Sequence, residues 1–433
     1  MKRITCLLLC LVLLLSGCGK KEQAKKKQPT IPAQLFYDPK VPVAPTEEPE
    51  DPAAILAQRR DVVEGHMRYM GTVRWQVDEE VTYSYKGVVS GNATAQDTIT
   101  LKPGRIYQGI PYTHGTGSAY NFLDYAVSQN EKGVYQLSNL PQAALDGVNR
   151  SGEGNRARVG NDCADCVFWA WSQVSSTIFF ENTVHMTEAY GCLKVGDYEF
   201  NMPIMETHTK EVTAANGDET MFAAYAQLQK ADALVYVKDS SGGHAIMAVE
   251  NHVEYREDGQ IDGSKSYITI LEQNAGSEVN QTVRMDGDDV IFLCEILDKK
   301  MTYRQLYRTG YLPITCKELV DPAPLAEVKV TETAKTFDKS NLFQSVVSAN
   351  YRITSVTVTI SSGEQVLQKA TCHAAEKEGY SFQLPRFLSE IEQDVMIGSI
   401  DLSKLKAGTY HCTFDCRLSN GQVVRFRDFQ LKI

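Results

Sequence analysis

The segment 160–171 reads GNDCADCVFWAW and places two cysteines three residues apart, directly before a run of bulky apolar side chains. Asn161 or Asp162 is a natural N-cap for a helix that begins at the first cysteine. One stripe of that helix carries Cys163, Val167, Ala170, Trp171 and Val174. Because Phe168 and Trp169 make the opposite face apolar as well, we expect the helix to be buried on nearly all sides.

Cys163 falls in the first turn of this predicted helix. The partial positive charge at a helix N-terminus favours a thiolate over a thiol, which suits a nucleophilic cysteine. The spacing to Cys166 is also that of a thioredoxin-like redox pair, although the β-α-β context of such a motif is absent. Two further interpretations are half of a zinc site, for which no second CxxC or HxxxH pair is present, and an inert core thiol beside a structural His244.

Of the eight histidines, His244 has the setting expected of a base for this thiol. It lies near the start of the alternating strand GGHAIMAVE at residues 242–250, and residues 267–274 form the next predicted strand. Antiparallel pairing of these strands would set His244 opposite the end of the second one. Glu272 and Asn274 leave that strand on the same face, so either side chain can orient the imidazole and stabilise its protonated form.

Two of these stretches resemble known cell-wall enzymes. The segment DCADCV at 162–167 resembles the nucleophile region of NlpC-type peptidases, and GGHAIMAVE with ITILEQN resembles the Gly-His…Glu-x-Asn pattern of the CHAP amidase/peptidase group. Both groups are papain-like peptidoglycan hydrolases. The resemblance implies an α+β papain-like catalytic domain with Cys163 as nucleophile, His244 as base, and Glu272 or Asn274 as the orienting residue.

A third stretch, YQGIPYTHG at 107–115, resembles the Gly-x-Pro-Tyr segment that these enzymes carry before the nucleophile. The resemblance implies that Tyr112 helps to bind the oxyanion. It implies no cofactor and no metal ion.

The N-terminus is typical of an export signal. Lys2 and Arg3 precede the apolar run 4–15, which is too short to cross a bilayer as a mature helix. The following Leu-Ser-Gly-Cys at 15–18 resembles the lipobox of bacterial lipoproteins. This resemblance implies a signal peptide at residues 1–17, lipidation of Cys18, and a protein held on the outer side of a bacterial cell membrane.

Residues 18–52 are expected to form a disordered tether, because a lysine- and proline-rich segment cannot bury enough apolar surface to fold. The whole chain has 433 residues and a formal net charge of -10, which argues against nucleic acid as a partner. A chain of this length also predicts more than one domain.

Two folded domains are expected. Residues 53–320 read as the α+β domain, with helices preceding the sheet strands, and a linker follows at VDPAP, residues 320–324. Residues 326–433 alternate with period two and carry the hairpin signal Asn420-Gly421, which predicts an all-β immunoglobulin-like sandwich.

Three cysteines of the predicted sandwich bear on its disulfides. Cys412 and Cys416 lie roughly 13 Å apart along one strand and cannot bond to each other. Either of them is free to pair with Cys372.

These observations together predict a surface-anchored cysteine hydrolase that cleaves amide bonds, with peptidoglycan peptides as the substrate that the resemblance implies. One alternative is a catalytically inactive papain-like lipoprotein that binds peptides or a partner. Another is a thiol oxidoreductase using Cys163 and Cys166. The sandwich is expected to act as a spacer or as a module that binds the cell wall or a protein.

Overall fold

The computed structural model describes residues 41–433 apart from 45–46, 85–97, 147–157, 201–207, 240–241, 275–280, 294–297, 335, 375–378 and 389–395. The predicted signal peptide, Cys18 and most of the predicted tether lie outside the described residues. Residues Phe36–Ile433 form one compact unit, in which α-helices and a larger share of β-sheet are mixed.

The first long helix is α2 (Pro52–Thr72). It begins after Asp51, whose side chain accepts a hydrogen bond of 2.9 Å from the backbone N–H of Ala54. The predicted tether boundary at residue 52 is too late, because the chain before α2 already packs on the folded unit. Ala44 is buried, and Glu48 forms a 2.6 Å ion pair with Arg59, whose side chain is fully buried.

A six-stranded sheet has the order β11-β12-β4-β1-β6-β5. Its strands are β1 (Arg74–Val77), β4 (Ile106–Gln108), β5 (Ala126–Gln129), β6 (Tyr135–Leu137), β11 (Thr282–Met285) and β12 (Asp288–Phe292). Beside it lie the strand pair β2 (Val81–Ser84) and β3 (Thr98–Leu101), and the short helices α3 (Ala119–Leu123) and α4 (Gln142–Asp146). The expectation that helices precede strands is therefore wrong, since these strands come before residue 163.

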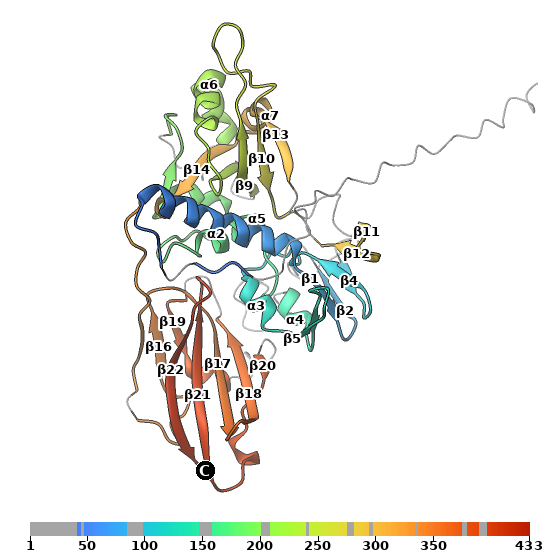
Figure 1. Ribbon diagram of the computed structural model, residues 1–433, viewed down its shortest axis with the longest axis vertical. Coiled ribbons are helices and arrows are strands. Elements are labelled where there is room, and N and C mark those ends of the chain that lie inside the picture. The colour runs from blue at the N-terminus through green and yellow to red at the C-terminus, as the bar shows by residue number, and fades with distance from the viewer. Residues whose placement is uncertain are drawn as a thin grey trace, which may run out of the picture. The chain divides into compact units, whose positions relative to one another are not determined.

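A second six-stranded sheet has the order β13-β10-β9-β8-β14-β7. Its strands are β7 (Cys192–Lys194), β8 (Ala233–Asp239), β9 (Gly242–His252), β10 (Tyr267–Leu271), β13 (Lys299–Thr302) and β14 (Leu312–Cys316). The helices that pack against it are α5 (Cys163–Trp171), α6 (Thr209–Tyr225) and α7 (Tyr303–Thr309). Two 3-10 helices, η3 (Thr183–Glu188) and η5 (Lys317–Leu319), complete this part, and Figure 1 shows α6 and α7 beside its strands.

Residues from 326 onward form two antiparallel sheets around a separate hydrophobic core, as an all-β sandwich requires. One sheet has the order β15 (Val330–Glu332), β16 (Val346–Ala349) and β19 (Ser381–Gln383). The other has the order β20 (Met396–Gly398), β18 (Gln365–His373), β17 (Ile353–Ser362), β21 (Thr409–Leu418) and β22 (Val423–Lys432). Along the chain, the 3-10 helix η6 (Leu384–Leu388) follows β19, and the 3-10 helix η8 (Leu402–Lys404) lies between β20 and β21. The predicted turn at Asn420-Gly421 joins β21 to β22, with Gly421 at φ 83°.

The suggested pairing of Cys372 with a cysteine of β21 is wrong. Cys372 and Cys416 both lie opposite Val356, on the two strands that flank β17. Neighbouring strands are about 4.8 Å apart, so these two cysteines are separated by roughly 10 Å, beyond the reach of a disulfide. Cys372, Cys412 and Cys416 are all buried in the sandwich core.

The sandwich contacts the helix that carries Cys163. The guanidinium of Arg352, 1% exposed, lies 5.1 Å from the ring centre of Phe168 on α5. Gln173, just beyond the same helix, donates a 2.8 Å hydrogen bond to the carbonyl of Ser419. Arg417 forms a 2.5 Å ion pair with the buried Asp124. The two predicted domains therefore share a buried polar and aromatic interface.

Candidate active site

Cys163 is the first residue of α5. The helix begins there because the side chain of Asp162 accepts a 3.0 Å hydrogen bond from the backbone N–H of Asp165. All nine residues of α5 are buried, as the two apolar faces predicted. Cys163 itself is 6% exposed and is a free thiol, so its sulfur lies at the positive end of a buried helix dipole.

His244 lies on β9 and reaches both partners that the sequence suggested for it. Its Nε2 donates a 2.7 Å hydrogen bond to Oε2 of Glu272, and its ring lies close enough to Cys163 for the two side chains to interact. Because Nε2 is engaged by the carboxylate, the nitrogen left for the thiol is Nδ1. Thiol, imidazole and carboxylate therefore form one continuous chain of polar contacts.

The strand register decides between the two orienting candidates. β10 pairs antiparallel with β9 as predicted, with Leu271 opposite Met247, and the side chain of Glu272 reaches His244. Asn274 makes no hydrogen bond to His244 within the described part of the chain. The carboxylate, and not the amide, is the group that contacts the imidazole.

Lys299 extends this chain of contacts and was not identified from the sequence. It lies on β13, next to β10, and its Nζ is 2.7 Å from Oε1 of Glu272. Glu272 is 4% exposed while Lys299 is 52% exposed, so a solvated ammonium partly neutralises a buried carboxylate. The stretch DKKMT offered no signal for this contact, because it depends on the pairing of two strands distant in sequence.

The electrostatics of the site favour a protonated imidazole. Burial alone disfavours the imidazolium, but Cys163 and Glu272 outweigh that cost and raise the pKa of His244 to about 10. Burial likewise disfavours the carboxylate of Glu272, yet the hydrogen bonds from His244 and Lys299 hold its pKa below the ordinary value. From His244 through Glu272 to Lys299 the charges alternate between positive and negative.

Tyr112 lies beside the nucleophile. Its backbone bridges to Asn161, two residues before Cys163, and its ring is 6.4 Å from that of His114. Burial raises the pKa of the Tyr112 phenol, and negative charge at Cys163 raises it further, so the hydroxyl keeps its proton and can donate a hydrogen bond.

The buried amide of Gln273 supports the backbone around the nucleophile. It donates hydrogen bonds of 2.9 Å to Oδ1 of Asn161 and 3.1 Å to the carbonyl of Ile110. The end of β10 is thereby fastened both to the start of α5 and to the loop that carries Tyr112. The sequence did not indicate this role, because Gln273 lies between Glu272 and Asn274, which were the two candidates for orienting His244.

Cys166 has a different environment from Cys163. It is fully buried, and its Sγ lies 3.9 Å from Sδ of Met70 on α2. The two cysteines of the CxxC stretch therefore face a polar site and an apolar core respectively.

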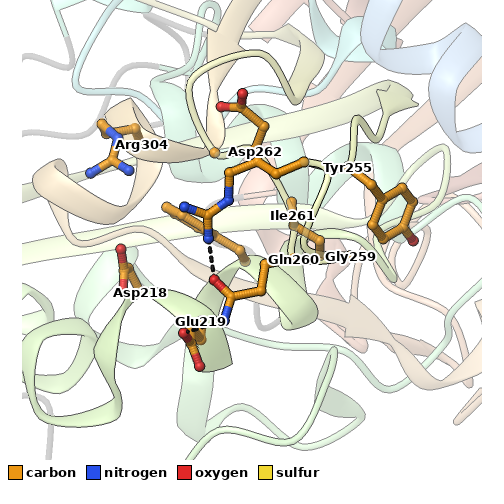
Figure 2. A pocket seen from close by; sticks show the side chains of 11 residues that line it. Asp218, Glu219, Tyr255, Gly259, Gln260, Ile261, Asp262 and Arg304 are labelled. Atoms are coloured by element: carbon orange, nitrogen blue, oxygen red, sulfur yellow. Dashed lines mark hydrogen bonds between the residues drawn. The ribbon is translucent and has the colours of Figure 1, made fainter.

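Apart from the site around Cys163, a hollow lies between α6, α7 and the connection from β9 to β10 (Figure 2). Its volume is about 510 Å³, and its polar lining includes Asp218, Glu219, Arg256, Asp262 and Arg304. The side chain of Arg256 donates a hydrogen bond to the side-chain oxygen of Gln260. The lining contains no cysteine, serine or histidine, so it offers no nucleophile of the kind found at Cys163.

Comparisons with known proteins identify no family for this chain, so the assignment of a function depends on the geometry of the site. Scans against protein-family models and against curated proteins give no match. Among solved structures, a tetra-tandem repeat in the extending region of a large adhesion protein is similar to part of this chain at 13% identity with a TM-score of 0.16. That alignment covers 46% of this chain and 40% of the other, and it supports no conclusion about fold or function.

Within the described ranges, no three His, Cys, Asp or Glu side chains gather as a metal site would require. No helix in the part of the chain that the structure describes is long and apolar enough to span a bilayer.

Proposed function

We propose that this protein is a papain-like cysteine hydrolase that cleaves amide bonds, with Cys163, His244 and Glu272 as its catalytic residues. The observation that carries the proposal is the continuous contact from a thiol at a buried helix N-terminus, through an imidazole, to a buried carboxylate. Three residues from separate elements meet in the order that nucleophilic catalysis requires.

Each residue has a defined role in the proposed reaction. The thiolate of Cys163 attacks the amide carbonyl, and the imidazolium of His244 gives its proton to the leaving amine. The same imidazole then takes a proton from the water that hydrolyses the thioester. Glu272 keeps the ring in place and stabilises its charged form. The backbone N–H of Cys163 and the hydroxyl of Tyr112 are the proposed donors to the oxyanion.

The substrate class rests on the resemblance of the three sequence stretches to NlpC and CHAP enzymes, which points to peptide bonds or amide bonds of peptidoglycan. The proposal also includes export, anchoring to a bacterial membrane through lipidated Cys18, and an immunoglobulin-like topology for the sandwich. Because the sandwich packs on α5 and its flanking residues, we assign it a role in supporting the catalytic helix in addition to any partner that it binds.

The test is hydrolysis of purified sacculi by the full chain, with the released fragments identified by mass spectrometry. Cys163→Ala is expected to abolish product formation. Cys166→Ser is the matched control three residues away, and a hydrolase should retain most of its activity because the sulfur of Cys166 lies in the hydrophobic core beside Met70.

The outcome separates the hydrolase from its rivals. If both cysteine variants lose activity equally while remaining folded, a thiol oxidoreductase fits better. If the wild-type protein binds fragments of sacculi but releases none, the chain is an inactive binding protein and the hydrolase proposal fails.

A further inference from the structure

Two cysteines outside the candidate site face each other across the second sheet. Cys192 on the edge strand β7 lies directly opposite Cys316 on β14 in an antiparallel pair. Side chains of directly opposed residues leave the sheet on the same face, so both sulfurs lie on one side.

The hydrogen bonds of the ladder show which kind of pair this is. Lys317 donates a backbone hydrogen bond of 2.7 Å to Gly191, and Val195 donates one of 3.0 Å to Pro313. In an antiparallel ladder, hydrogen-bonded and non-hydrogen-bonded pairs alternate. Cys192 and Cys316 therefore form a non-hydrogen-bonded pair, in which the Cα atoms approach to about 4.5 Å. That separation lies within the range that disulfides span.

From this register we propose that Cys192 and Cys316 are a modification site and form a cross-strand disulfide. Both are free thiols in the reduced chain. The bond forms by exchange with a second disulfide, such as that of a thiol oxidase or of oxidised glutathione. The two cysteines lose two electrons and two protons, and the oxidant is released as two thiols. The predicted export of the chain would supply oxidising surroundings.

The burial of these thiols indicates when the bond forms. Burial raises the pKa of Cys192 to about 12 and raises that of the fully buried Cys316 as well. A protonated, buried thiol reacts slowly, so we expect oxidation while the chain folds, before β7 docks on β14. In the reduced protein, Sγ of Cys316 donates a hydrogen bond of 2.9 Å to Oε2 of Glu318, and this bond would be lost in the disulfide. The other carboxylate oxygen of Glu318 would still accept a hydrogen bond from Ser175.

The proposed bond differs from other pairings that the chain offers. Cys372 and Cys416 are separated by an intervening strand, and Cys163 is engaged by His244. Only the pair on β7 and β14 is in direct register among the described cysteines.

The bond would enclose the strands that carry His244 and Glu272, because both residues lie between 192 and 316 in the chain. It would also fasten η3, which packs against β7, β8 and β9. The expected consequence is a more stable second sheet. The inference does not depend on the proposed hydrolase activity.

The experiment is oxidative refolding of the full chain. The protein is unfolded in urea with reductant and refolded in a mixture of oxidised and reduced glutathione. Free thiols are then alkylated, and the protein is digested without reduction. Mass spectrometry is expected to find a peptide pair linking Cys192 to Cys316 that disappears after reduction. The thermal unfolding midpoint should be higher for the oxidised than for the reduced protein.

Two variants complete the test. Cys192→Ser should refold to the same circular dichroism spectrum, lose the linked peptide, and show no dependence of the unfolding midpoint on oxidant. Cys163→Ala should keep both the link and that dependence. Alkylation of Cys316 in the refolded, oxidised wild-type protein after urea is added would overturn the proposal, as would a link from Cys192 to any other cysteine.

Discussion

Replacing Glu272 by glutamine tests whether the carboxylate sets the charge state of the candidate site. The pKa of His244 is raised to about 10, because the interactions of the imidazolium with Cys163 and Glu272 outweigh the cost of its burial. Glutamine keeps an acceptor for Nε2 and removes the charge, so the loss should be about 1.5–3 kcal/mol, the usual value of a hydrogen bond to a charged group.

The direction of the effect follows from linkage. Since the carboxylate favours the imidazolium, Glu272→Gln lowers the pKa of His244, and the protonated ring is lost at a lower pH than in the wild type. The thiolate then loses part of its counter-charge near neutral pH. We expect the alkylation of Cys163 by iodoacetamide at neutral pH to slow by about ten- to a hundredfold, the kinetic equivalent of that free energy.

The assay needs no substrate, because alkylation of the Cys163 peptide is followed by mass spectrometry across a pH series. Cys166 and Cys316 of the same domain are buried and serve as internal controls. Asn274→Ala is the matched variant, two residues along the chain, and should react like the wild type. Unchanged alkylation in Glu272→Gln, or a larger effect from Asn274→Ala, would refute the assignment of Glu272 as the orienting residue.

Three further predictions concern residues around the site and the domain interface. Lys299→Met should slow alkylation of Cys163 by less than Glu272→Gln, because the ammonium is half-exposed, and Lys299→Arg should restore the rate. Asp51→Ala removes the cap of α2 and should lower the free energy of unfolding in urea by about 1 kcal/mol. Asp124 is buried, but the contact with His373 and the charge of Arg417 outweigh desolvation and hold its pKa below the ordinary value. It therefore stabilises the fold above the unfolded pKa of a carboxyl, and this contribution is lost as the pH falls through the lower folded value. Asp124→Asn should lower the free energy of unfolding at neutral pH by about 3 kcal/mol and make that free energy fall less steeply as the pH is lowered. If the free energy of unfolding of the variant falls with decreasing pH as steeply as that of the wild type, Asp124 does not have this role.

The contact between the sandwich and α5 changes the role that the sequence suggested for the C-terminal region. A spacer or binding module needs no buried contact with its neighbour, whereas Arg352 packs on Phe168 with almost no exposure. Burying a guanidinium requires compensating partners, and the aromatic rings around Arg352 supply a favourable surface for it. The sandwich is in this respect part of the environment of the nucleophile helix.

The sequence by itself determined the local structure around the site. The Asp162 cap and the two apolar faces specified a buried helix beginning at Cys163, and alternation with turns specified the strands that carry His244 and Glu272. These features follow from short-range periodicity and hydrogen bonding, which act within a few residues along the chain.

Only the tertiary structure decided which groups meet. The choice of Glu272 over Asn274, the contact of Lys299 with Glu272, and the opposition of Cys192 and Cys316 all depend on strand register. Register is set by the packing of whole sheets between residues far apart in sequence, and a local pattern does not encode it. The same long-range packing placed Arg352 against α5 and brought Ala44 and Glu48 onto the folded unit.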